Sequence, residues 1–127
     1  MMNKLSMVLL IAAGLLNFVP VIGVISTDQL SSMYGVEITS ADMSVLMRHR
    51  AVMLGLVGGL MIVAAFRPTL RLPAAIVGLI SMASFIVLAG LATEIGPNVS
   101  NVAIADIAGV VIILGVLAIE LRGRRDG

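Results

Sequence analysis

The segment MRHRA, residues 47 to 51, places two arginines and the single histidine of the chain inside an apolar stretch. Arg48 could bind an anionic group through a bidentate guanidinium contact, and His49 could exchange a proton near neutral pH. Asp106 is the acidic counterpart, because it interrupts the apolar run from residue 102 to 121. Ionisable groups inside membrane segments often mark ligand, ion or proton sites. These three residues are the first candidates for a ligand-binding site.

Four further polar residues extend this candidate site. Asn17 interrupts the first apolar run, Ser81 and Ser84 lie at similar depth in the third, and Tyr34 lies in the first long connection, where it could cover the cluster. Together they predict a narrow polar path or a pocket that opens outward. The simpler interpretation is structural, because serines in apolar helices usually bond to their own backbone and an asparagine can bond a neighbouring helix.

Helical phase predicts how the charges pair. At 100° per residue, Arg48 shares a helix face with Gly55 and Gly59, a small-residue spacing that lets two helices approach closely. Arg48 is therefore predicted to point into the bundle and to pair with Asp106. Arg50, about 200° away, is predicted to reach outward to lipid head groups. A purely structural ion pair and a ligand site remain alternative interpretations of this cluster.

The elements that must position these residues are long apolar runs. The chain has 127 residues, of which 60% are hydrophobic and 12% charged. About 20 residues of helix cross a hydrocarbon core, and four such runs occur, at about 5–26, 43–66, 74–93 and 102–121. The sequence therefore predicts an all-α, four-transmembrane-helix bundle that forms a single integral membrane domain over residues 1–127.

The first connection, residues 27 to 42, is the longest. A short helix is expected to begin at Thr27 and to end at Gly35, and Thr39 or Ser40 is expected to cap the second long helix. The other two connections, residues 67 to 73 and 94 to 101, are predicted to be tight turns.

The basic residues predict the orientation. If both termini are cytoplasmic, one side of the membrane holds Lys4, Arg67, Arg71, Arg122, Arg124 and Arg125. Basic residues are enriched in cytoplasmic loops, so this orientation is preferred. Glu120 is expected to pair with Arg124 one helical turn later.

A length count places the charged residues in depth. Residues 51 to 66 are 16 residues of helix, about 24 Å long, so a core of about 30 Å extends to about Met47. Arg48 and His49 would then lie just inside the outer boundary. Asp106 would lie about 6 Å inside the same boundary.

Composition excludes several kinds of chemistry. The absence of cysteine removes disulfides, thiol nucleophiles and iron–sulfur clusters from the chain. A net charge of +1 does not indicate nucleic-acid binding. We therefore expect no cofactor, no metal and no nucleic acid, and we expect membrane lipid as a partner of a chain of this composition.

The motifs LNFVPVIG, LSSMYGVEI and LMRHRAVMLGLVGGLMIVAAFRP resemble a family of small bacterial four-helix membrane proteins of unknown function. The resemblance implies a multi-pass protein of the bacterial inner membrane. Some members carry the label phosphopantetheine adenylyltransferase, which this sequence does not support, because one histidine cannot form the HxGH motif of those enzymes. The layout is more distantly similar to the membrane domains of sterol isomerases and sigma-2-receptor-like proteins, where acidic residues comparable to Asp106 help to hold apolar ligands.

Three functions follow as hypotheses. The first is a non-enzymatic protein that binds a lipid-like or hydrophobic small molecule, or a membrane-protein partner. The second is a proton-coupled small transporter that works as an oligomer, with Asp106 as the proton-carrying acid. The third is a membrane enzyme in which His49 and a carboxylate, Asp106 or Asp42, perform acid–base catalysis on an apolar substrate. A homo-oligomer could form through the Gly55 and Gly59 face.

Overall fold

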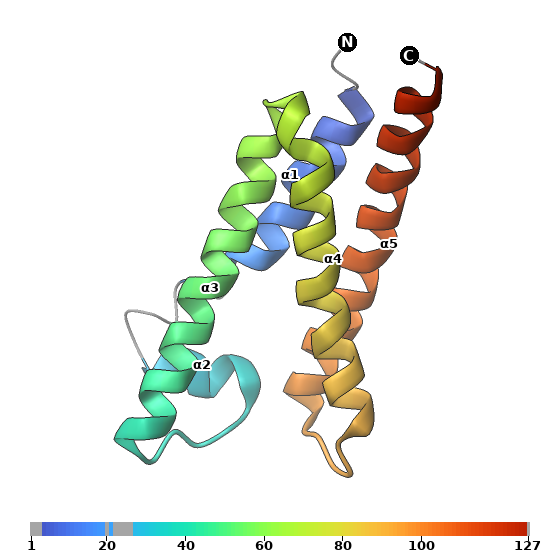
Figure 1. Cartoon of the computed structure of the whole chain (residues 1–127). Coiled ribbons are helices and arrows are strands. Elements are labelled where there is room, and N and C mark those ends of the chain that lie inside the picture. Colours follow the sequence, from blue (N-terminus) through green and yellow to red (C-terminus); the bar gives the residue numbers. More distant parts are fainter. Residues whose placement is uncertain (1–3, 20, 22–26, 127) are drawn as a thin grey trace.

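The computed structural model describes residues 4–19, 21 and 27–126. The described residues are 88% helical and contain no strand. Five helices follow one another along the chain: α1 (Lys4–Phe18), α2 (Thr27–Tyr34), α3 (Ala41–Ala65), α4 (Pro68–Leu91) and α5 (Pro97–Asp126) (Figure 1). The prediction of an all-α helical bundle is confirmed.

Three of these helices are long and apolar enough to cross a membrane, namely α3, α4 and α5. The first predicted span, residues 5–26, differs from the others. Its described helix, α1, has 15 residues, about 22 Å, and residues 20 and 22–26 lie outside the described part of the chain. Three membrane-compatible helices and one shorter apolar helix therefore form the bundle.

The four main helices form a ring that is complete over only part of the bundle's length. α1 packs against α3 and α5, α3 packs against α4, and α4 packs against α5. α1 begins at the end of the bundle where α5 finishes, and it runs along only part of the bundle's length (Figure 1). In the other half α2 packs against both α3 and α5. One half of the ring is thus closed by α1, and the other half is bridged by α2.

Local sequence signals set the ends of α2 and α3. Gly35 follows α2 with a φ of +66°, a conformation that glycine adopts without strain, and its amide donates to the carbonyl of Ser31 at 2.9 Å. The Ser40 hydroxyl accepts a hydrogen bond from the Met43 amide at 3.1 Å at the start of α3. The predicted short helix ending at Gly35 and the predicted Ser40 cap are confirmed.

The two tight connections are shorter than predicted. α4 begins at Pro68 and α5 begins at Pro97, and proline suits the first turn of a helix because the amide it lacks has no intrahelical partner there. As a result Arg71 belongs to α4, while Asn98 and Asn101 belong to the first turns of α5.

Glycine brings α1 and α3 into backbone contact. A Cβ atom on Gly58 would lie 2.5 Å from the carbonyl oxygen of Gly14 and 3.0 Å from the amide nitrogen of Phe18. A Cβ on Gly55 would meet the side chain of Val21, and one on Gly59 would meet nothing within 4 Å. The prediction that Gly55 and Gly59 form the close packing face is therefore wrong for Gly59, and Gly58 takes that role.

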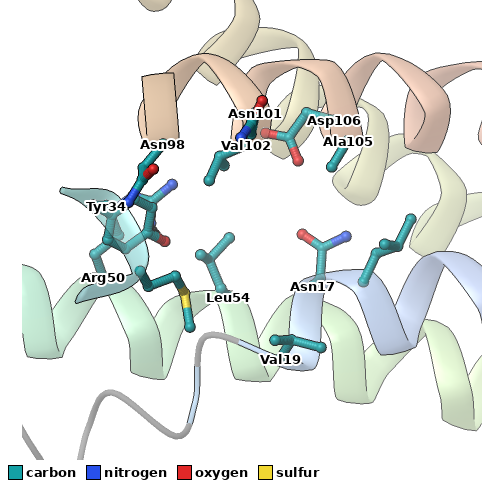
Figure 2. Close-up of a pocket in the computed structure, with 12 residues that line it drawn as sticks. Asn17, Val19, Tyr34, Arg50, Leu54, Asn98, Asn101, Val102, Ala105 and Asp106 are labelled. Atoms are coloured by element: carbon teal, nitrogen blue, oxygen red, sulfur yellow. Dashed lines mark hydrogen bonds between the residues drawn. The ribbon is translucent and has the colours of Figure 1, made fainter. Parts of the chain in front are cut away.

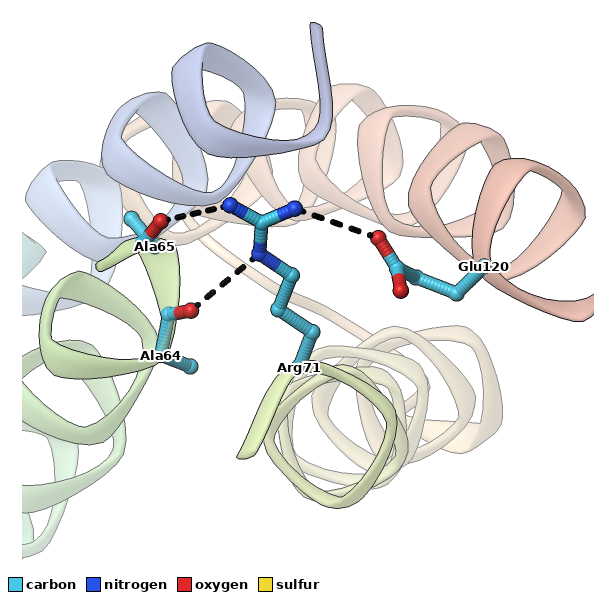
Figure 3. A network of polar contacts seen from close by, with 4 residues as sticks. All are labelled: Ala64, Ala65, Arg71 and Glu120. Atoms are coloured by element: carbon cyan, nitrogen blue, oxygen red, sulfur yellow. Dashed lines mark hydrogen bonds and ion pairs between the residues drawn. The ribbon is translucent and has the colours of Figure 1, made fainter. Parts of the chain in front are cut away.

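Arg71 ties three helices together at the closed half of the bundle (Figure 3). Its Nε donates to the carbonyl of Ala64 at 3.3 Å and its Nη2 to the carbonyl of Ala65 at 2.7 Å. Its Nη1 forms an ion pair with Oε1 of Glu120 at 3.5 Å, and the arginine side chain is only 1% exposed. The last carbonyls of a helix lack partners within it, so Arg71 supplies donors to the end of α3.

These contacts correct two predictions. Arg71 is a buried residue of α4 and not a loop residue on the basic side, because the helix begins earlier than the apolar run indicates. Glu120 pairs with Arg71 instead of Arg124. The guanidinium of Arg71 is buried and needs a carboxylate partner, whereas the exposed guanidinium of Arg124 does not.

Candidate ligand-binding site

A cavity of about 490 Å³ lies at the end of α1, between α3 and α5. Residues of α1, α2, α3 and α5, with Val19 just after α1, form its walls (Figure 2). The apolar lining consists of Leu16, Val19, Met33, Leu54, Val102 and Ala105, and the polar lining consists of Asn17, Tyr34, Arg50, Asn98, Asn101 and Asp106. The cavity therefore combines one cation, one anion and several neutral polar groups with an apolar wall.

Arg50 is the cation of the cavity, and its position is fixed by contacts to two other helices. Its Nη1 donates a hydrogen bond to the phenolic oxygen of Tyr34 on α2. The centre of its guanidinium group lies 5.0 Å from the ring centroid of Tyr34 and 5.0 Å from that of Phe85 on α4. Cation–π contacts at this distance are attractive. The half-buried guanidinium is thus held between two aromatic rings at the edge of the cavity.

Asp106 is the anion of the cavity, and it lies on the wall formed by α5 (Figure 2). Arg50 is the cation that attracts its carboxylate. Each of the two residues lies nine positions after the first residue of its helix, about 14 Å along the axis, and both helices begin at the same end of the bundle (Figure 1). No described ion pair joins these two side chains directly. Opposite charges therefore lie at similar depth on separate walls of one cavity.

Three asparagines complete the polar lining, and two of them make described hydrogen bonds. Asn17, 4% exposed, donates through Nδ2 to the carbonyl of Ala13 at 3.1 Å at the end of α1. Asn98 donates through Nδ2 to the carbonyl of Ser32 at 3.0 Å, which joins α5 to α2. With the Arg50–Tyr34 contact, α2 is joined to α3 on one side and to α5 on the other, and it closes one end of the cavity.

The structure brings together some of the predicted site residues and separates others. Asn17, Tyr34 and Asp106 line the cavity. Arg48 and His49 are exposed and do not line it. The predicted cluster of Arg48, His49 and Asp106 is thus divided: Asp106 lines the cavity, and Arg48 and His49 do not.

The two serines also lie away from the cavity. Ser84 is exposed, and its hydroxyl donates to the carbonyl of Ser81 at 2.9 Å on the same helix. Neither residue lines the cavity. The structural interpretation of these serines, a hydrogen bond to their own helix, describes what Ser84 does.

The predicted pairing of Arg48 with Asp106 is wrong because Arg48 does not line the cavity, and the arginine that shares the cavity with Asp106 is Arg50. The buried face of α3 carries Gly58, Met61 and Ala65, and Arg50 precedes Met61 by eleven residues, which is about 20° more than three full turns. The prediction followed Gly55 and Gly59 instead, a face about 100° away. The sequence did contain Gly58, which marks the correct face. Gly55 and Gly59 form a competing small-residue pattern on α3, and helical phase alone does not choose between the two.

Sequence reasoning also missed Phe85, Asn98 and Asn101. Asn98 and Asn101 are three residues apart, and so share a face once α5 is known to begin at Pro97. Assigning them to a turn concealed that relation. Phe85 could not be found from α4 alone, because its role depends on Arg50 from α3.

No model of a protein family, no curated protein and no solved structure matches the chain. Among the described residues, no group of three or more His, Cys, Asp or Glu side chains could hold a metal ion. The resemblance to the bacterial four-helix family stays a prediction, and the function has to be inferred from the cavity itself.

Proposed function

We propose that the protein is a non-enzymatic, multi-pass protein of the bacterial inner membrane whose cavity binds a lipid-like small molecule. The observation that carries this proposal is the cavity between α1, α2, α3 and α5, which has Arg50 and Asp106 on facing walls. Its volume of about 490 Å³ falls within the range of about 300–1,000 Å³ that is usual for small-molecule sites.

The proposal includes four membrane spans with both termini in the cytoplasm. In support, α1 begins and α5 finishes at the same end of the bundle, together with the α3–α4 connection (Figure 1). That end carries Lys4, Arg67, Arg122, Arg124 and Arg125. Basic residues favour the cytoplasmic side, so the cavity and α2 would lie toward the opposite side.

The lining argues for an amphiphile. A purely apolar ligand would leave the half-buried carboxylate of Asp106 and the Nε and Nη2 donors of Arg50 without polar partners, which is costly in an apolar site. A small, fully polar ligand would leave Leu16, Val19 and Leu54 uncovered. A molecule with a charged head and a hydrocarbon part matches both kinds of wall.

Ligand retention tests this function. The protein would be purified from membranes in mild detergent, and bound molecules would be detected by native mass spectrometry and by extraction. We expect a bound amphiphile in the wild type, loss of that molecule in Arg50→Gln, and retention in the matched control Arg48→Gln, which removes the same charge from the exposed side of α3. Absence of any bound molecule in the wild type, or equal retention in both variants, would contradict the proposal.

Proton-coupled transport is the second candidate, and the observation that favours it is the placement of Asp106 on the cavity wall. A carboxylate at such a position can carry a proton and exchange it for a substrate. Flux of an amphiphilic cation driven by a pH gradient across liposomes would test this function. Flux that is unchanged in Asp106→Asn would rule out that role for the carboxylate.

A further inference from the structure

The contacts of Arg50 leave one side of its guanidinium group available to a ligand. An arginine carries five N–H donors, and the described hydrogen bond uses Nη1 toward Tyr34. The rings of Tyr34 and Phe85 lie against the guanidinium group. Within the described part of the chain, Nε and Nη2 of Arg50 have no acceptor. A carboxylate or phosphate can accept two parallel hydrogen bonds from such an edge.

Asp106 presents the complementary requirement. An ionised carboxylate only accepts hydrogen bonds, and no described residue donates one to Asp106, although the side chain is half-buried and lines the cavity. Unsatisfied acceptors in such sites are unfavourable. A ligand group that carries N–H donors and a positive charge would satisfy this carboxylate.

The charge balance of the cavity then decides between ligand classes. Its lining holds one cation and one anion. A ligand with only a negative group would be repelled by Asp106, and one with only a positive group would be repelled by Arg50; such repulsion is stronger in a site of low dielectric constant. Selectivity commonly comes from repulsion of this kind as well as from attraction. A ligand that is neutral overall but carries both charges is repelled by neither residue if it is oriented correctly.

We propose that the cavity selects a zwitterionic amphiphile, whose anionic group binds Arg50 and whose N–H-bearing ammonium group binds Asp106. This inference rests on the proposed function, because it names the class of ligand for the same cavity. Phosphoethanolamine is the simplest group with this chemistry. It could arrive as the head group of a membrane phospholipid or as a free soluble zwitterion, and the adjoining Leu16, Val19 and Leu54 would accommodate hydrocarbon in the first case.

Competition among defined lipids tests the inference. Delipidated protein in detergent would be titrated with phosphatidylethanolamine, phosphatidylcholine and phosphatidylglycerol of identical chains, and the bound lipid would be counted by native mass spectrometry. We expect phosphatidylethanolamine to bind about ten- to hundredfold more tightly than phosphatidylglycerol, which lacks the ammonium group, because one charged hydrogen bond contributes an effect of that size. Phosphatidylcholine, whose ammonium has no N–H, should fall between them.

Two isosteric variants make the test specific. Asp106→Asn should reverse the order in favour of phosphatidylglycerol, because the only charge left in the lining is then that of Arg50. Glu94→Gln, which removes an exposed carboxylate between α4 and α5, should leave the order unchanged. Arg50→Gln should weaken the binding of all three lipids, because each carries a phosphate. Circular dichroism would establish that each variant keeps its helix content.

The outcomes separate the two proposals. Equal binding of all three lipids, or a wild-type order that persists in Asp106→Asn, overturns the zwitterion assignment and leaves a ligand site in place. If none of the three lipids binds, both the zwitterion assignment and the proposal that the cavity binds a lipid are overturned. Displacement of the bound lipid by dihexanoyl phosphatidylethanolamine but not by free phosphoethanolamine supports a lipid as the source, and equal displacement by both supports a soluble zwitterion. Displacement by neither overturns the assignment.

Discussion

Arg71 and Arg50 occupy opposite halves of the same bundle, and their surroundings differ completely. Arg71 is 1% exposed and binds two backbone carbonyls and Glu120. Arg50 is half-buried, bonds one phenol, and borders a cavity that also contains Asp106. A fully satisfied buried arginine fixes the positions of helices. An arginine held by aromatic rings, with donors still available, is placed to bind something else.

The length of α1 explains why the two halves differ. Where α1 is present, small residues allow close packing, as at the contact of Gly58 with Gly14. Beyond the end of α1 at Phe18, α2 packs against both α3 and α5, and the cavity lies among these four helices. Mutations in the first half should therefore change stability, and mutations in the second should change ligand binding.

The largest effect is expected for Arg71→Met. This change leaves the carboxylate of Glu120 without its cation and the carbonyl of Ala65 without the donor that Arg71 supplies, while the carbonyl of Ala64 still accepts from the Arg67 amide at 3.1 Å. Removal of one partner from a buried ion pair typically costs about 3–5 kcal/mol of unfolding free energy. Unfolding in detergent, followed by circular dichroism, would measure it. Arg67→Met, at an exposed position, should stay within about 0.5 kcal/mol of the wild type. A loss no greater than that of the control would show that Arg71 does not hold the helices together.

Gly58→Ala should have the next largest effect. Its Cβ would collide with backbone atoms of α1, which cannot rotate away as a side chain can, and overpacking of this kind costs about 1–3 kcal/mol. Gly59→Ala adds the same methyl group one residue later in open space, so the higher helix propensity of alanine should make it neutral or more stable by up to about 1 kcal/mol. Thermal unfolding of the pair would give the difference, and equal values would contradict the close approach of α1 and α3.

Tyr34→Phe should have a smaller effect than Gly58→Ala, and it should lower both stability and ligand retention. The variant keeps the ring beside Arg50 but removes the hydroxyl that accepts its hydrogen bond. A loss of about 0.5–1.5 kcal/mol of stability is expected for one hydrogen bond, together with weaker ligand retention because the guanidinium becomes less fixed. Native mass spectrometry and thermal unfolding would be measured on the same sample. Unchanged retention would show that the phenol does not position Arg50.

Asn98→Ala should have the smallest global effect and a clear local one. It removes the bond between α5 and the Ser32 carbonyl, at a cost of about 1 kcal/mol or less at an exposed position. Hydrogen exchange should become faster in α2 and remain unchanged in α4. The control Ser84→Ala, which removes only a bond within α4, should leave exchange in α2 as it is. Equal exchange in α2 for both variants would indicate that Asn98 does not restrain that helix.

The fold was largely predictable from the sequence, because its signals are local. Runs of apolar residues indicate the long helices. The Gly35 turn marks the end of α2, and the Ser40 cap marks the start of α3. Apolar runs do not show where a helix extends into polar sequence, so the starts of α4 and α5 were placed too late. That error assigned Arg71 and Asn98 to turns.

The site was predicted only in part, because it depends on contacts between helices. Asp106, Tyr34 and Asn17 were identifiable as polar residues in or beside apolar runs. The choice between Arg48 and Arg50 required the rotation of α3 about its own axis. That rotation is set by Gly58 against Gly14, a contact across two helices that one helical pattern does not determine.

The two attachments of α2 have a mechanical consequence. Among the described residues, no Cα atom of α3 lies within 8 Å of a Cα atom of α5, and at the cavity the two helices are linked through α2, by Tyr34 to Arg50 and by Ser32 to Asn98. Any change in the separation of α3 and α5 must therefore lengthen at least one of these two bonds or move α2 with the helices. The position of α2 therefore depends on the width of the cavity, and α2 transmits a change in that width to the surface of the protein.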